Sequence, residues 1–277
     1  KDVADAMRDH FEGTPMDMTQ DIGAGGNALP YRWRPMSFTS GGNSYCNERA
    51  IATQQTGFWL VGQSRKELPD AVGGLLWFGT DDSATSYLTP IYTCTSEVPE
   101  CFREGNGDLL TYSPTSAFWM CNRVANACYK MYNHMSAEVR KKIDEWENAK
   151  IADVKESDAE AMRLYREASE TPVKMLRRGR GELKKVYDPF AQVRSFLTGY
   201  TVDTAQDIFE QWVELETLLL VKYMDGNVKG QNPDGSFKTS PYSDAIPGEI
   251  LHPDYTGRWK DAVAADKGEV LMMVEPK

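Results

Sequence analysis

Long apolar runs are missing from this chain of 277 residues. Its most apolar stretch, from Leu215 to Met224, is interrupted by Glu216 and Lys222, whereas a membrane-spanning helix needs about 20 consecutive apolar residues. We therefore expect a soluble protein without a membrane span. The residues after Lys1 also lack the charged and then apolar pattern of a signal peptide, but an upstream segment could carry one, so the sequence leaves export open.

Cysteine is scarce as well. Five cysteines are too few for a disulfide-stabilised scaffold, and none of them forms the Cys-x-x-Cys pair typical of zinc sites, so we predict neither a metal site nor a cofactor. Cys94 and Cys101 flank a proline-containing loop and could form a bridge in an oxidising compartment, with two buried thiols as the alternative. The five are Cys46, Cys94, Cys101, Cys121 and Cys128.

A basic surface is not indicated either. The chain has 31 Lys and Arg against 41 Asp and Glu, a net charge of −10 and a pI near 4.9. Binding to a phosphate backbone normally needs a concentrated basic surface, so nucleic acid is excluded as the main partner. The hydrophobic content of 41% suffices for a substantial core, and the length permits one large domain or two smaller ones.

The first half of the chain has the composition of β-structure. Ala50 to Gln63 is rich in Thr, Ile, Val, Phe and Trp, and with the apolar run Val72 to Gly79 it predicts a long β-hairpin. Residues 108–112 are a further candidate strand. A helix is expected from Ser113, because Pro114 suits the first helical position. Its apolar stripe consists of Ala117, Cys121, Val124 and Cys128.

Helical periodicity extends from Ser136 to Tyr223. Residues 157–160 have the form of a capping box, and Gly179 and Gly181 indicate a loop between helices. The last long helix is expected from about Asp203. The positions expected on the buried faces are Val139, Ile143, Trp146, Ile208, Trp212, Leu215 and Leu219.

The residues after 225 are rich in Gly, Pro, Asn and Ser, which favours an ordered extended tail with a short helix around residues 258–265. We therefore predict an α+β protein in three parts. These are a sheet-rich part with one packed helix (1–135), a helical layer or subdomain (136–224) and an extended C-terminal tail (225–277).

The most informative stretch is residues 47–56, which read Asn-Glu-Arg-Ala-Ile-Ala-Thr-Gln-Gln-Thr. A charged triplet runs directly into a strand-like segment that carries amides and hydroxyls where apolar residues would be expected. Two further strings accompany it, Arg8-Asp-His-Phe-Glu-Gly-Thr-Pro15 and Gly73-Gly-Leu-Leu-Trp-Phe-Gly79. Together these residues resemble the C69 dipeptidases, a family of N-terminal-nucleophile cysteine peptidases, and the resemblance extends to the helix that carries Trp119.

The resemblance implies an Ntn-hydrolase-like αββα sandwich, of which these residues form a part. It also implies metal-free hydrolysis of dipeptides by a cysteine freed as the first residue of the mature chain. This chain begins at Lys1, so we expect the nucleophile on an upstream segment or a companion subunit, in an enzyme that is a homo-oligomer. The alternative is a noncatalytic module that binds peptide or glycan through exposed Trp and Tyr side chains.

Asn47 and Arg49 are the leading candidates for a catalytic role. Asn47 could donate its side-chain amide to the oxyanion of the reaction, and Arg49 could hold the cysteine thiolate or a substrate carboxylate through its fork of donors. The alternative is that Asn47 forms a turn and that Arg49 makes a structural ion pair.

The candidates for substrate binding are Gln54, Gln55, Asp81 and Asp82. On a strand the two glutamines would face opposite sides, so only one of them would point toward a cleft, and a buried hydrogen-bond network is the alternative. One of the two adjacent carboxylates could bind the α-ammonium group of a peptide, whereas the alternative is a solvated turn. We expect a structural role for His10.

Overall fold

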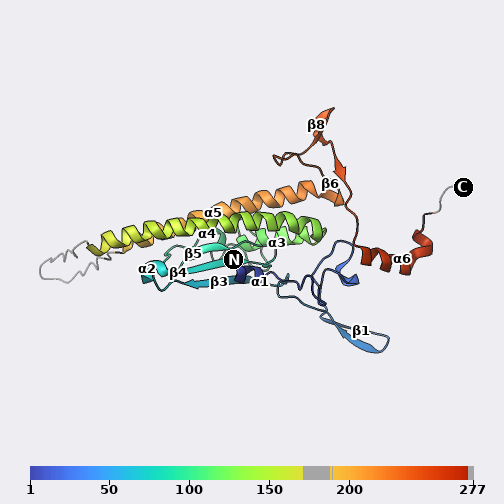
Figure 1. Cartoon of the computed structure of the whole chain (residues 1–277), viewed down its shortest axis with the longest axis horizontal. Coiled ribbons are helices and arrows are strands. Elements are labelled where there is room, and N and C mark those ends of the chain that lie inside the picture. Colours follow the sequence, from blue (N-terminus) through green and yellow to red (C-terminus); the bar gives the residue numbers. More distant parts are fainter. Residues whose placement is uncertain (171–187, 189, 274–277) are drawn as a thin grey trace.

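The computed structural model describes residues 1–170, 188 and 190–273 (Figure 1). A three-stranded antiparallel sheet lies against two long helices, and smaller elements extend from this body. The predicted α+β class is therefore confirmed. Within the described ranges, no helix combines the length and the apolar character that crossing a membrane requires.

The central sheet has the strand order β3, β4, β5. β3 (Phe58–Ser64) and β4 (Gly74–Thr80) pair along their full lengths, and β5 (Thr89–Tyr92) pairs with the other edge of β4. A short helix, α2 (Asp70–Gly73), connects β3 to β4. The predicted hairpin thus exists, but its first strand does not include residues 50–57.

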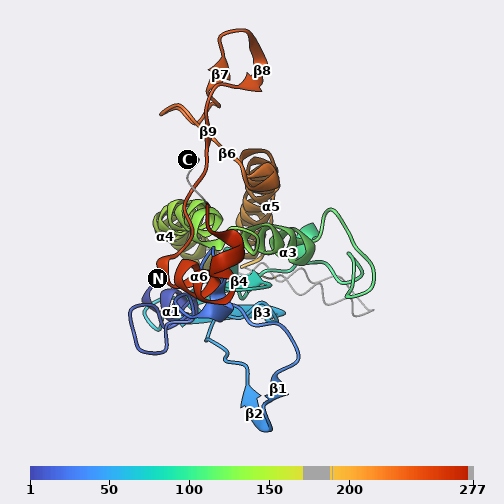
Figure 2. The same cartoon turned by 90° about the vertical axis from the view of Figure 1, so that its right-hand side faces the viewer.

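Two long helices cover one face of this sheet, as both views show (Figures 1 and 2). They are α4 (Tyr132–Glu170) and α5 (Ala191–Lys222), and α3 (Ala117–Cys128) packs beside them. The core between sheet and helices includes Leu75, Tyr92, Val154, Leu164 and Leu197.

The apolar faces predicted for these helices are confirmed. All of these side chains are buried and belong to one core cluster, because a 3.6-residue period places them on one side of each helix. Burial of one large apolar side chain contributes about 1.5–3 kcal/mol. The confirmed positions are Ala117, Cys121, Val124, Cys128, Val139, Ile143, Trp146, Ile208, Trp212, Leu215 and Leu219.

The opposite face of the sheet is apolar but open. Side chains alternate along β3, so Trp59 is buried while Phe58 and Leu60 point the other way and are 64% and 46% exposed. Phe58 stacks on Phe78 of β4 with ring centroids 6.1 Å apart. An exposed apolar sheet face of this kind usually marks a surface that other structure covers.

Small elements surround the body. Before the sheet lie α1 (Asp2–Ala6), η1 (Ile22–Ala24) and a projecting hairpin of β1 (Ser37–Ser40) and β2 (Asn43–Cys46); η2 (Glu100–Phe102) precedes α3. After α5 come η3 (Met224–Gly226), β6 (Val228–Lys229), β7 (Thr239–Ser240), β8 (Ser243–Pro247), β9 (Ile250–Leu251) and α6 (Gly257–Leu271). The described residues after 225 thus form short strands and one helix, which is longer than predicted.

Two predictions around residue 110 are wrong for local reasons. Residues 108–112 form a turn rather than a strand, because Asp108 Oδ1 accepts a hydrogen bond from the backbone N–H of Leu110 at 2.7 Å. The Leu110 side chain is 98% exposed. α3 begins at Ala117 rather than at Ser113, whose hydroxyl donates to the preceding loop instead.

Two boundaries inside the helical region also differ from expectation. Ser157 is buried in the interior of α4, so residues 157–160 are not a capping box. α5 already includes the residues before Asp203, because Val193 and Leu197 continue its apolar face. The predicted loop glycines, Gly179 and Gly181, lie outside the described residues.

Cys94 and Cys101 are free thiols, but only Cys101 is buried as the alternative to a bridge predicted, whereas Cys94 is half-buried. Cys101 is buried in the core beneath α3, where its Sγ lies 3.9 Å from the carbonyl of Ala205. Cys94 packs against the separate core between the sheet and the long helices.

Candidate active site

The polar residues singled out in the sequence gather at one end of the β3–β4 hairpin. At this end the backbone N–H of Asp81 donates to the carbonyl of Gly57 at 3.0 Å. The segment that precedes β3 contains Gln54 and Gln55, and the segment that follows β4 contains Asp81 and Asp82. Antiparallel pairing therefore brings both candidate segments to the same end of the hairpin.

Asp81 and Asp82 are 1% and 0% exposed, so the expected alternative of a solvated turn is wrong. The carboxylate of Asp82 is saturated with donors. It accepts hydrogen bonds from the hydroxyl of Tyr31, from the hydroxyl of Thr85 at 3.1 Å and from the backbone N–H of Ala84 at 3.2 Å. These three bonds fix the orientation of Asp82.

Asp81 has one satisfied and one free carboxylate oxygen. Its Oδ1 accepts a hydrogen bond from Asn122 Nδ2 at 3.1 Å, whereas Oδ2 has no partner among the described residues. Burial raises the pKa of Asp81 to about 7, and the neighbouring charge of Asp82 acts in the same direction. Burial also raises the pKa of Asp82, against the hydrogen bond from Tyr31. Asp81 can therefore hold a proton near neutral pH or accept one more donor.

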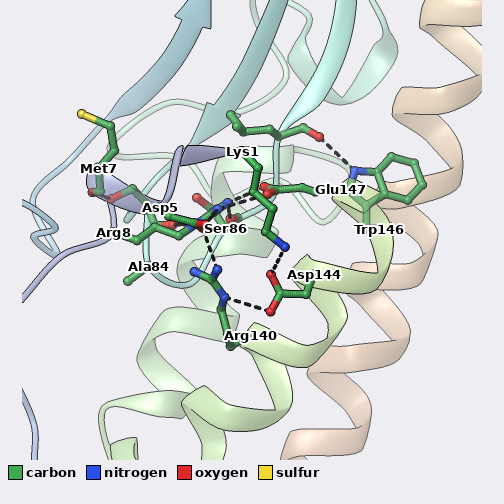
Figure 3. Close-up of polar contacts among 12 residues, drawn as sticks. Lys1, Asp5, Met7, Arg8, Ala84, Ser86, Arg140, Asp144, Trp146 and Glu147 are labelled. Atoms are coloured by element: carbon green, nitrogen blue, oxygen red, sulfur yellow. Dashed lines mark hydrogen bonds and ion pairs between the residues drawn. The ribbon is translucent and has the colours of Figure 1, made fainter. Parts of the chain in front are cut away.

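Arg8 holds the loop that contains Asp81 and Asp82. Figure 3 shows Arg8 with Ser86 of this loop and with Glu147. Arg8 Nε donates to the carbonyl of Ser83 at 2.9 Å and its Nη2 to that of Ser86 at 3.3 Å. Both terminal nitrogens also contact the carboxylate of Glu147 on α4, at 3.1 and 2.5 Å. The three segments are thus joined through one buried guanidinium. Arg8 belongs to one of the sequence motifs, but no pattern in the sequence connects it to Glu147, which is 139 positions away.

A hydrogen-bonded chain leads from the exposed Glu12 through the buried side chains of His10 and Tyr31 to Asp82. His10 contacts Glu12 Oε1 through Nδ1 at 3.1 Å and the hydroxyl of Tyr31 through Nε2 at 3.2 Å, and Tyr31 donates to Asp82. Burial opposes the charge of Glu12, but the hydrogen bonds from His10 outweigh it and lower the pKa of Glu12 to about 2. These contacts agree with a structural role for His10, and they add Tyr31 to the site.

Residues 47–56 form an irregular segment with a turn at Gln54 and Gln55, rather than the strand predicted from Ala50, because their side chains bond to groups outside a strand ladder. Asn47 Nδ2 donates to the carbonyl of Trp33 at 3.2 Å and to that of Pro35 at 2.7 Å, which agrees with the turn alternative. Both amide hydrogens are used in this way. The role of Asn47 at the oxyanion stays a prediction, and it requires one of these bonds to open.

Arg49 and Gln55 contact each other at the exposed surface of this segment. Arg49 Nη2 donates to Gln55 Oε1, and Arg34 Nη2 reaches the same oxygen at 3.4 Å. The structural ion pair considered for Arg49 is absent from the described residues. Gln54 points elsewhere, since its amide donates to the carbonyl of Arg32 at 2.7 Å.

Four of the cysteines have surroundings that disfavour the thiolate, which is the nucleophilic form of the side chain. Burial raises the pKa of Cys101 to about 12, and it also raises the pKa values of Cys94, Cys121 and Cys128. Cys46 is exposed on β2, and its side chain has no hydrogen bond to another described residue.

Comparison with known proteins adds two findings. The family model described as "Peptidase family C69" matches residues 1–145. The protein named "Probable dipeptidase B" of Lactococcus lactis subsp. lactis (strain IL1403) is 22% identical over 120 residues, which are 43% of this chain and 21% of that protein. The matched part therefore spans about a fifth of the length of that relative.

Proposed function

Because the chain belongs to peptidase family C69, we propose that it forms part of a cysteine dipeptidase that cleaves the peptide bond of dipeptides. The similarity to a protein named probable dipeptidase B supports this assignment. One structural observation carries it furthest. At the end of the β3–β4 hairpin, the segment after β4 carries Asp81, a buried carboxylate with a free oxygen. The neighbouring segment before β3 carries Arg49, an exposed guanidinium. Opposite charges in this arrangement suit a substrate with two free termini.

We place the nucleophile on a cysteine outside residues 1–277, in an upstream segment or a companion subunit. The buried, high-pKa thiols of Cys101, Cys121 and Cys128 support this placement. A cysteine at a mature N-terminus would carry its own base, because a free α-amine has a pKa near 8.

The residues of the hairpin end then divide between the two ends of the substrate. In this proposal Asp81 Oδ2 accepts a hydrogen bond from the α-ammonium group of the substrate. Asp82 holds the loop that contains both aspartates in place. Arg49 takes a carboxylate or the thiolate, with Gln55 beside it. Gln54 fixes the segment that carries Arg49 and Gln55, because its side-chain amide donates to the carbonyl of Arg32.

The fold proposal is an αββα sandwich in which the open face of the central sheet is an inner face. The exposed side chains of Phe58 and Leu60 support it, since a second sheet packed there would remove them from water. The three-part division at residues 135 and 224, and assembly into a homo-oligomer, belong to the same proposal.

The test uses the full-length protein with a panel of dipeptides, followed by chromatographic detection of free amino acids. A thiol-directed dipeptide analogue should label one cysteine, and peptide mapping should locate it outside residues 1–277. Absence of both hydrolysis and labelling would overturn the proposal. Saturable binding of peptide or glycan without hydrolysis would instead support the noncatalytic alternative.

A further inference from the structure

We propose that Arg34 and Arg49 together form a binding site for a carboxylate, and that this site takes the C-terminal carboxylate of the substrate. The inference rests on the proposed function for the identity of the substrate, and it adds Arg34 as a residue that determines specificity. The ligand class is an organic carboxylate at the end of a short peptide.

The two guanidinium groups converge on one neutral atom. Arg49 Nη2 and Arg34 Nη2 both donate to Gln55 Oε1, the latter at 3.4 Å, and Arg49 Nη2 also contacts Thr53 Oγ1 at 3.2 Å. Both arginines are exposed, and within the described residues their other N–H groups have no hydrogen-bond acceptor. Several donors therefore remain free on two neighbouring forks, a geometry that matches the two oxygens of a carboxylate.

The charge of this pair is uncompensated in a chain with a net charge of −10. Neither arginine takes part in an ion pair between described residues. Glu48 is the acidic residue nearest to Arg49 in the sequence, and its carboxylate approaches Arg32 instead, at 3.8 Å. Two positive charges that share a neutral acceptor attract an anion. Because both side chains are exposed, an anion can reach them from solvent.

Arg34 is held in this place by Asn47, which is a candidate catalytic residue in the sequence. Asn47 Nδ2 donates to the carbonyls of Trp33 and Pro35, which flank Arg34 on both sides. The amide thus clamps the backbone of Arg34 next to the segment that carries Arg49. Asn47 is accordingly a positioning residue for the carboxylate site.

The test compares a dipeptide with the same dipeptide as its C-terminal amide, using the full-length enzyme. For the wild type we expect kcat/KM to favour the free carboxylate at least about tenfold. Arg34→Gln should raise KM for the dipeptide about tenfold, leave kcat within about twofold and leave the amide unaffected. Arg34→Lys should restore part of the preference, because the charge is kept while the fork is lost. Arg103→Gln, on an exposed loop, is the control.

Two outcomes would overturn the inference. One is an equal effect of Arg34→Gln on dipeptide and amide, which would assign Arg34 to the nucleophile or to the fold. The other is a kinetic profile that matches the Arg103→Gln control. In either case the dipeptidase assignment itself would stand.

A binding measurement separates the two proposals if no dipeptide is cleaved. The arginine side-chain N–H signals of the ¹⁵N-labelled full-length protein are followed during titration with N-acetylglycine, and N-acetylglycinamide serves as the control. A saturable shift with the acid alone, lost in Arg34→Gln, would support the carboxylate site even without peptidase activity. A lack of any saturable shift would sink it.

Discussion

The guanidinium of Arg8 and the carboxylate of Glu147 face each other through two hydrogen bonds, and their side chains are only 3% and 4% exposed. The ring of Trp59 covers the Arg8 guanidinium, which lies 4.8 Å from the ring centroid. Among the described residues Glu147 has no other ion-pair partner, whereas Arg8 also contacts two backbone carbonyls and lies 3.6 Å from the partly exposed carboxylate of Asp5. Removal of either charge would therefore leave the other buried without its main partner.

For this reason Glu147→Gln should lower the free energy of unfolding by about 3–5 kcal/mol, as measured by urea denaturation. The matched control lies on the same helix. Glu160→Gln removes an exposed partner of Arg163 and should change the free energy of unfolding much less, because solvent screens a surface pair. Equal effects of the two substitutions would mean that the buried pair contributes nothing beyond a surface pair.

Two adjacent leucines near the end of α5 provide a test of the core. Leu219 is 0% exposed and Leu220 is 56% exposed. We expect Leu219→Ala to destabilise the protein by about 2–5 kcal/mol, because a cavity remains in the cluster beneath α3 and α4. Leu220→Ala should change the free energy of unfolding by less than about 0.5 kcal/mol in the same denaturation experiment. Similar losses at both positions would contradict the packing of this face.

The core-facing residues of the helices could be predicted because apolar side chains recur at helical spacing over many turns. Ile143 and Trp212 are examples of positions that the period alone identifies. The strand predicted over residues 50–57 failed for the opposite reason. Its β-branched residues suggested a strand, but hydroxyls such as those of Thr53 and Thr56 bond to groups within three residues and replace ladder pairing.

The site could be predicted only where its residues are close in sequence. The string from Asn47 to Gln55 and the pair after β4 were visible as motifs. Tyr31, Arg34 and Glu147 were not, because each joins the site through a contact that the tertiary fold creates. No local sequence pattern identifies such a partner, because a single tyrosine, arginine or glutamate at these positions belongs to no motif.

The low pKa of Glu12 predicts a loss of stability in acid. The folded-state pKa of about 2 lies below the model-compound value of 4.5, so the contribution is present above pH 4.5 and is lost as the pH falls through about 2. Because half of the Glu12 side chain is exposed, screening limits the effect to about 1 kcal/mol or less. Glu12→Gln should therefore be less stable than the wild type at pH 6 and equally stable near pH 2, as followed by thermal denaturation. A difference that persists at pH 2 would assign the effect to something other than charge.

Asp81 predicts a pH dependence of the opposite sign. Its folded-state pKa of about 7 lies above the ordinary value of 3.8, so the folded state favours the protonated form. This contribution is complete below pH 3.8 and is lost as the pH rises through 7, with a total of up to about 4 kcal/mol. Asp81→Asn should abolish this part of the decline in the ligand-free protein, because an amide cannot ionise.

Denaturant unfolding at pH 4, 5.5, 7 and 8.5 provides the measurement, with the exposed Asp203→Asn on α5 as the control for loss of one carboxylate. As the pH rises from 4 to 8.5, the free energy of unfolding of Asp81→Asn should increase relative to that of the wild type. The free energy of unfolding of Asp203→Asn should follow the wild type throughout. A wild-type profile that stays parallel to that of Asp81→Asn would show that Asp81 is already ionised in the folded protein. A cation from elsewhere in the full-length chain would then compensate the free oxygen, and the α-ammonium group of the substrate would have to bind at another acidic group.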